Sequence, residues 1–269
     1  MTDRRKFTNP VKDRFQAGDV ALGMIVRLAR SGDIALIAKT TGHDFVFLDG
    51  QHALFSVETI GAIAQVAWAS GVAPLVRARH IEDPDIPRLL DNGVMGVVFP
   101  DVNTPEQARR AVEICKFAPY GKRSVSGGYS IFEFQAKPLA ESTRVLNDTT
   151  LVVCMIETRE GLENVEAIAA VPGVDVLHLG CNDLLNDMGN PGAFGSPEIM
   201  AAIRRMIAAC KKHGKWAGLG GDKDLGRQAM LISEGIQFIT TQSDVAFLMA
   251  EASRRTAELR KAAIGRPAT

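Results

Sequence analysis

Residues 151–184 read LVVCMIETREGLENVEAIAAVPGVDVLHLGCNDL, and this stretch decides the fold. Two apolar runs, Leu151–Ile156 and Val174–Leu179, flank a segment of helical period, Gly161–Ala170, that ends at V-P-G. The runs lack the in–out alternation of a half-exposed strand, which is typical of parallel strands buried on both faces. The stretch therefore predicts a strand–helix–strand unit with parallel strands.

The same unit recurs on both sides of this stretch. Six further apolar runs resemble buried strands, and segments of helical period separate several of them. These runs are Leu22–Leu28, Phe45–Leu48, Pro74–Arg77, Gly96–Phe99, Lys215–Leu219 and Phe238–Thr240. Helices are expected at Ser56–Ser70, Asp83–Asn92, Thr104–Lys116, Ser196–His213 and Asp224–Glu234.

Eight strands with helices between them, in a chain of 269 residues, predict an α/β fold of the (β/α)₈ TIM-barrel type. An open doubly wound sheet would give similar local signals. We find no linker, so we expect residues 1–269 to form a single (β/α)₈-barrel domain. Two irregular stretches, Phe117–Leu146 and Asn186–Gly195, are expected over the carboxyl ends of the strands, where barrel active sites lie.

Composition excludes several classes of function. Lys and Arg number 31, as do Asp and Glu, and we find no long run of like charge, which argues against nucleic-acid or membrane-surface binding. No stretch approaches the ~20 apolar residues of a spanning helix, and the start, MTDRRKFTNP, does not resemble a secretory signal. Four widely spaced cysteines predict a reducing, cytoplasmic location. They are Cys115, Cys154, Cys181 and Cys210.

Two carboxylates stand at the ends of neighbouring predicted strands. Glu157 ends M-I-E, and Asp183 ends G-C-N-D. Two carboxylates held that close repel each other unless one is protonated or a cation lies between them. Oxygen ligands with room for water and substrate suit Mg²⁺ or Mn²⁺. The alternative is that one of them caps a helix or pairs with an arginine such as Arg159.

Three more polar residues lie at strand ends. Arg77 ends its strand with a planar guanidinium that suits a carboxylate, although a structural pair with Asp49 or Glu157 is an equally good interpretation. His52 follows Asp49 by three residues, and a carboxylate can orient an imidazole for acid–base catalysis. The other histidines are expected to be structural or to lie in loops and at helix ends. No lysine ends a predicted strand, which argues against a Schiff-base aldolase.

These residues belong to an ordered series of motifs. The series comprises D-G-Q-H, P-L-V-R, G-V-V-F-P, A-P-Y-G-K-R, I-E-T, V-P-G-V-D, G-C-N-D-L and T-T-Q-S-D. From about Leu22 to the last helix, the chain resembles the HpcH/HpaI family of metal-dependent, pyruvate-using aldolases. The resemblance implies a (β/α)₈ barrel, a Mg²⁺, Mn²⁺ or Co²⁺ ion held by Glu157 and Asp183, and substrate binding by Arg77. It also implies an acid–base dyad of His52 and Asp49, working through a water.

The implied reaction is cleavage of a 4-hydroxy-2-oxoacid to pyruvate and an aldehyde through a metal-stabilised pyruvate enolate. Backbone N–H groups at Gly180, Cys181 and Asn182 are expected to orient the substrate carboxylate. Oxaloacetate decarboxylation or carbon–carbon joining through the same enolate is an alternative, and a non-catalytic metabolite-binding barrel is another. The resemblance further implies a homohexamer, a trimer of dimers that exchange a C-terminal helix at about Asp244–Ala263.

The chain departs from the family pattern at four places. Gln51 replaces the acid of D-G-E-H, Met155 replaces the Gln of Q-I-E-T, and Cys181 replaces a Pro. Arg123–Ser124 stands where the family tends to have R-G. None of these changes removes a predicted ligand, and together they point to a divergent subgroup with a less polar or larger acceptor.

Overall fold

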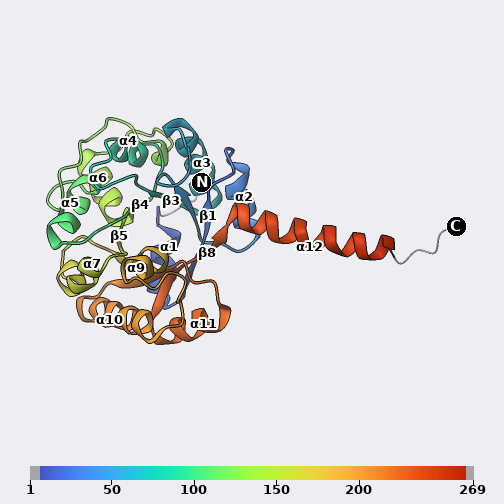
Figure 1. Ribbon diagram of the computed structural model, residues 1–269. Helices are drawn as coiled ribbons and strands as arrows, with labels where there is room; N and C mark the ends of the chain where they lie inside the picture. Colours follow the sequence, from blue (N-terminus) through green and yellow to red (C-terminus); the bar gives the residue numbers. More distant parts are fainter. Residues whose placement is uncertain (1–6, 265–269) are drawn as a thin grey trace.

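The computed structural model describes residues 7–264, and its centre is a closed barrel of eight parallel strands in sequence order (Figure 1). β1 pairs with β8 as well as with β2, which closes the sheet and excludes the open alternative. The strands are β1 Ala21–Val26, β2 Phe45–Asp49, β3 Ala73–Arg77, β4 Gly96–Phe99, β5 Leu151–Ile156, β6 Val176–Gly180, β7 Trp216–Gly220 and β8 Ile236–Ser243. The predicted (β/α)₈ barrel is confirmed.

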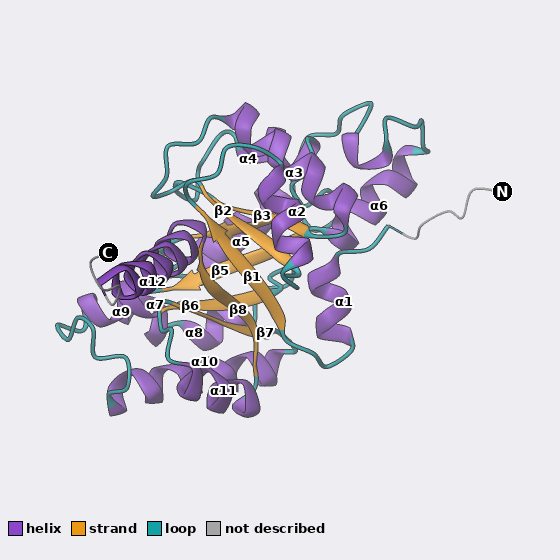
Figure 2. Cartoon of the chain, turned by 90° about the vertical axis from the view of Figure 1, so that its right-hand side faces the viewer, coloured by secondary structure: helices purple, strands orange, loops and turns teal. Residues whose placement is uncertain are grey.

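Helices surround the barrel (Figure 2). Those on or near its outer face are α2 Asp33–Thr40, α3 Val57–Ser70, α4 Ile86–Asp91, α5 Pro105–Cys115, α6 Leu139–Thr149, α7 Arg159–Glu163, α8 Val165–Ala169, α10 Pro197–His213 and α11 Leu225–Glu234. The others are α1 Pro10–Gln16, the 3₁₀ turn η1 Ser130–Phe132, α9 Cys181–Asp187 and α12 Asp244–Ile264. The predicted helix at 161–170 is in fact two short helices, α7 and α8.

The helix ends follow local chemistry. The Ser56 hydroxyl accepts the Thr59 N–H at the start of α3, which satisfies a backbone donor that has no partner within the helix. At the other end of α3, Gly71 adopts a φ of 80°, a conformation that glycine takes without steric cost. Thr104 and Gln107 form a reciprocal capping box at the start of α5. These signals explain why α3 and α5 begin close to their predicted positions.

One predicted position is wrong. The stretch Phe117–Leu146 joins α5 to β5, so it lies at the amino ends of the strands rather than over their carboxyl ends. It is also less irregular than expected, since it contains η1 and most of α6. Three of its aromatic side chains, Phe117, Tyr129 and Phe132, are buried, and the Phe117 and Tyr129 rings are in edge contact at 6.4 Å. The stretch therefore packs at the amino end of the barrel and takes no part in forming its mouth.

Aromatic packing fills the amino-terminal half of the barrel. The rings of Phe45 and Phe238 stack inside the barrel with centroids 4.4 Å apart. A side chain on Gly23 would collide with the Phe45 ring, so a glycine on β1 makes room for it. Below them Phe15 of α1 stacks on Trp216 at 4.6 Å. The core is therefore packed at the amino end, while polar side chains collect at the carboxyl end.

The last helix, α12, leaves the barrel and projects away from it (Figure 1). All side chains from Phe247 to Ala263 are exposed in the single chain. Within the described residues, no helix is both long enough and apolar enough to span a bilayer.

Candidate active site at the carboxyl end of the barrel

The carboxyl ends of the strands line an open pocket with a volume of about 80 Å³. Its walls include a guanidinium from β3, a carboxylate from the first turn of α9 and backbone at the β6–α9 junction. The lining residues are Ile25, Arg27, Phe47, Arg77, Met155, His178, Gly180, Cys181, Asn182, Asp183, Gly220, Gly221 and Thr240. Polar groups from separate strands therefore converge on one space, as the strand-end positions predicted.

Glu157, directly after β5, is buried beside this pocket. Its Oε1 accepts the Asp101 N–H at 2.8 Å, but its buried Oε2 has no hydrogen-bond partner within the described residues. Burial is the main cause of a raised pKa of Glu157, which is about 7 once the smaller effects are included: the charges of Asp101 and Asp183 raise it, while the Asp101 hydrogen bond and the charge of Arg77 lower it. A side chain on Gly180 would lie 2.7 Å from Oε2, so the glycine leaves room beside this oxygen on the β6 side.

Asp183 provides a second carboxylate near Glu157. It lies in the first turn of α9, is exposed, and lines the pocket. No cluster of three or more His, Cys, Asp or Glu side chains suited to a metal occurs among the described residues, so protein ligands here would number two. Two carboxylates with open positions suit Mg²⁺-type ions, which usually keep several waters. The buried, unpartnered oxygen of Glu157 fits such an ion.

The raised pKa of Glu157 makes a prediction for the metal-free protein. Between pH 4.5 and about 7 the folded state binds a proton that the unfolded state does not, so stability falls as pH rises through this window. The cost is about 3 kcal/mol above pH 7. Glu157→Gln should therefore raise the melting temperature of chelator-treated protein more at pH 8 than at pH 5. An equal rise in melting temperature at both pH values, each measured relative to Glu160→Gln, would contradict the conclusion that Glu157 carries a buried charge at pH 8.

Asp49 and Arg77 form a buried pair on β2 and β3. Arg77 Nε donates to Asp49 Oδ1 at 2.9 Å, and Arg77 Nη2 donates to Oδ2 at 2.7 Å. Burial alone would raise the pKa of Asp49, but the bonds and charge of Arg77 outweigh it and hold that pKa below its usual range. The structural pair of Arg77 with Asp49, one of the two interpretations of the sequence, is therefore present. Arg77 Nη1 makes no hydrogen bond within the described residues. It remains available to a ligand.

His52 does not pair with Asp49 through its imidazole. Asp49 Oδ1 accepts the backbone N–H of His52 at 3.2 Å, and the His52 side chain is exposed. The carboxylate therefore holds the turn after β2 rather than a ring nitrogen, and within the described residues the predicted dyad is linked only through the backbone. The neighbouring Gln51 buries an Oε1 atom that has no partner within the described residues.

Two other groups at the pocket are uncharged. His178 points into the barrel between Gly218 and Gly220, where any side chain would approach its ring within 3 Å. Burial lowers the pKa of His178 to about 3, so its imidazole is neutral. Burial likewise raises the pKa of the Cys181 thiol to about 12. A neutral, buried imidazole agrees with the expectation that His178 is structural. Because the Cys181 thiol is neutral, Cys181 can contact a ligand through its backbone and not through a thiolate.

Sequence reasoning missed Arg27. The predicted strand ran to Leu28, whereas β1 ends at Val26 and leaves Arg27 at the strand end. Its Nε donates to Asp49 Oδ2 at 2.6 Å, and its side chain lines the pocket. A single arginine inside an otherwise apolar run was the signal that could have revealed it.

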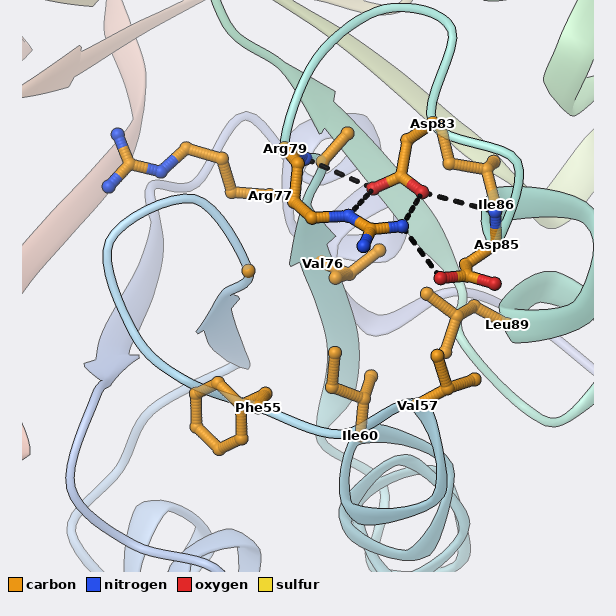
Figure 3. A pocket seen from close by; sticks show the side chains of 12 residues that line it. Phe55, Val57, Ile60, Val76, Arg77, Arg79, Asp83, Asp85, Ile86 and Leu89 are labelled. Atoms are coloured by element: carbon orange, nitrogen blue, oxygen red, sulfur yellow. Dashed lines mark hydrogen bonds and ion pairs between the residues drawn. The ribbon is translucent and has the colours of Figure 1, made fainter.

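A second pocket lies on the outer side of β3, between α3 and α4 (Figure 3). It is largely apolar and includes Phe55, Ile60 and Leu89. At its edge Arg79 pairs with Asp83 and Asp85, and the Arg77 side chain leads away from it towards Asp49. Its charged groups pair with each other, and none of the carboxylates Asp49, Glu157 and Asp183 lines it, so it lacks the acidic groups expected of the catalytic site.

Comparisons with known proteins identify the relatives of this chain. The model of the HpcH/HpaI aldolase/citrate lyase family matches residues 23–246. A 4-hydroxy-4-methyl-2-oxoglutarate aldolase of Hapsidospora irregularis is 37% identical over 80% of both chains. A hydroxypyruvate/pyruvate aldolase of Cupriavidus necator is 34% identical over 93% of this chain and 91% of its own.

A solved structure supports the same assignment. The HpcH/HpaI aldolase from Desulfitobacterium hafniense DCB-2 superimposes with a TM-score of 0.87 and 29% identity, covering 95% of this chain and 97% of that one. The predicted activity, that of a class II pyruvate aldolase and hence a carbon–carbon lyase, is confirmed by the agreement of these relatives. The chain belongs to the HpcH/HpaI aldolase/citrate lyase family.

Proposed function

We propose that this aldolase cleaves a 4-hydroxy-2-oxoacid to pyruvate and an aldehyde at the pocket formed by Arg77, Asp183 and the β6–α9 junction. The observation that carries the proposal is the buried Glu157 Oε2, which has no protein partner within the described residues, beside the exposed Asp183. A buried carboxylate without a partner is costly unless a ligand or a proton satisfies it. Mg²⁺, Mn²⁺ or Co²⁺ held by Glu157 and Asp183 would do so.

The chain's own residues account for binding and proton transfer. Arg77 Nη1 faces the substrate's anionic end, while its other nitrogens stay on Asp49. Backbone N–H groups at Gly180, Cys181 and Asn182 orient the same carboxylate. When bound, the divalent ion would supply Lewis-acid stabilisation of the negative charge that develops on the 2-oxo oxygen.

His52 is the acid–base group in this proposal. Its exposed imidazole takes the proton of the C4 hydroxyl through a water, and Asp49 orients it through the backbone of the turn. The C3–C4 bond then breaks to release the aldehyde, and the pyruvate enolate that remains is protonated at C3. Oxaloacetate, which loses CO₂ to give the same enolate, needs no proton removed from a hydroxyl.

A direct assay tests the proposed activity. Cleavage of 4-hydroxy-2-oxopentanoate and decarboxylation of oxaloacetate should both be lost in chelator and restored by Mg²⁺, Mn²⁺ or Co²⁺. Decarboxylation without any aldol cleavage would replace the aldolase proposal with the decarboxylase alternative. An unchanged rate of aldol cleavage in chelator would contradict the proposed role of the metal ion.

We further propose that residues 1–269 form a single domain and that the chain assembles in the cytoplasm as a homohexamer, a trimer of dimers. The exposed α12 supports an exchange of this helix between two copies, since an isolated helix is marginally stable in water. Its first turns expose Phe247, Leu248 and Met249. Light scattering should give six chains for the wild type and fewer for Leu248→Asp with Met249→Asp, whereas an unchanged mass would contradict the exchange.

A further inference from the structure

Arg27 and Arg77 meet on one carboxylate. Arg27 Nε and Arg77 Nη2 donate to the same Asp49 Oδ2, at 2.6 and 2.7 Å. The distance between these two nitrogens therefore cannot exceed the sum of the two hydrogen-bond lengths. The two guanidinium groups thus line one pocket at a short, set spacing.

The backbone that carries Arg27 is held from both sides. The Asp244 carboxylate, which follows β8, accepts three successive N–H groups, those of Arg27, Leu28 and Ala29, at 3.0, 2.9 and 2.8 Å. Arg30 Nη1 donates to the carbonyl oxygens of the same three residues. The loop after β1 is therefore clamped, and the stem of Arg27 starts from a defined place.

Arg27 adds positive charge beyond what Asp49 requires. Asp49 already takes two hydrogen bonds from the more deeply buried Arg77. The Arg27 side chain is 42% exposed, and its two Nη atoms have no hydrogen-bond partner within the described residues. Lys223, beyond β7, adds positive charge nearby: burial lowers its pKa to about 8, and the charge of Arg27 contributes to that shift.

We propose that Arg27 is a specificity-determining residue that binds a second carboxylate of the substrate, attached to C4. The preferred substrates are then 4-hydroxy-2-oxodicarboxylates, and the carbonyl product released with pyruvate is itself a 2-oxoacid. A planar guanidinium whose two Nη groups are free matches a carboxylate in geometry and charge. This inference rests on the proposed aldol cleavage, because C4 is defined by that reaction.

Binding of ligands that cannot be cleaved tests Arg27 separately from catalysis. 2-Oxoglutarate and 2-oxopentanoate differ only in a terminal carboxylate against a methyl group. Calorimetry on the Mg²⁺-loaded full chain should show that the wild type prefers 2-oxoglutarate by about tenfold to a hundredfold. Arg27→Gln should lose this preference while still binding 2-oxopentanoate, and Arg27→Lys should keep part of it. Arg109→Gln, which removes an exposed arginine of α5, should behave as the wild type.

Two kinds of outcome would overturn the inference. The first is a wild type without preference, or an Arg27→Gln variant that retains it. The second is equal weakening of both ligands by Arg27→Gln, which would mean that Arg27 only supports Asp49.

Turnover separates this inference from the proposed function. The kcat/KM of the wild type should be higher for 4-hydroxy-2-oxoglutarate than for 4-hydroxy-2-oxopentanoate, and Arg27→Gln should reduce only the former, by a factor similar to that in binding. If the wild type cleaves neither compound, aldol cleavage fails while the binding comparison still decides the role of Arg27. If both are cleaved and both fall equally in Arg27→Gln, the aldolase stands and the role of Arg27 is overturned.

Discussion

Glu157→Ala and Asp183→Ala should each abolish metal-dependent aldol cleavage while leaving the barrel folded. Each variant removes one of the two carboxylates proposed to hold the ion, and Lewis-acid stabilisation is worth several kcal/mol. The kcat/KM should therefore fall by about 10³-fold or more. Glu157 is buried, but among residues 7–264 it has only one hydrogen bond, to the Asp101 N–H, so its removal breaks little internal structure.

The measurement is the rate of pyruvate release with saturating Mg²⁺, alongside circular dichroism to check folding. Glu160→Ala provides a matched control, because this exposed carboxylate lies on α7 three residues after Glu157. It should retain wild-type activity. Substantial activity in either Glu157→Ala or Asp183→Ala that persists in chelator would remove the metal assignment.

His52→Ala should lower aldol cleavage by roughly 10²–10⁴-fold, the usual scale of general acid–base catalysis. It should affect oxaloacetate decarboxylation much less, because loss of CO₂ requires no proton transfer from a C4 hydroxyl. Both rates are measured on the same preparation, with His80→Ala as an exposed-histidine control. Equal losses in the two reactions would indicate that His52 supports the loop rather than the proton transfer.

The sequence predicted the barrel because its strongest signals are local. Continuous apolar runs identify buried parallel strands, and serine, threonine and glycine caps mark where α3 and α5 begin or end. The helices α1, α2 and α9 were missed because they are short, seven or eight residues each, and carry little periodicity. The longer α6 was missed as well, because most of it lies in the stretch Phe117–Leu146, which was expected to be irregular.

The position of the Phe117–Leu146 stretch could not be predicted from its irregular composition. Whether such a segment lies at the carboxyl or the amino ends of the strands depends on whether it follows a strand or a helix. Its proline, glycine and aromatic residues resemble those of an active-site loop, but the stretch comes after α5 and packs under the barrel.

The candidate site was predictable as a set of strand ends, but its internal pairing was not. Asp49, Arg77 and Glu157 stand where the sequence placed them, at the ends of β2, β3 and β5. The choice of partner depends on side-chain direction, which sequence spacing does not reveal. Hence Asp49 binds the side chain of Arg77 and only the backbone of His52.

The central claim is that Glu157 and Asp183 together hold a divalent ion at this pocket. Its most direct test is titration of chelator-treated wild type, Glu157→Ala and Asp183→Ala with Mn²⁺, following bound ion by electron paramagnetic resonance. We expect one Mn²⁺ per wild-type chain, a changed spectrum when pyruvate is added, and no specific binding in either variant. Binding of one Mn²⁺ with equal affinity in the wild type and both variants would contradict the claim.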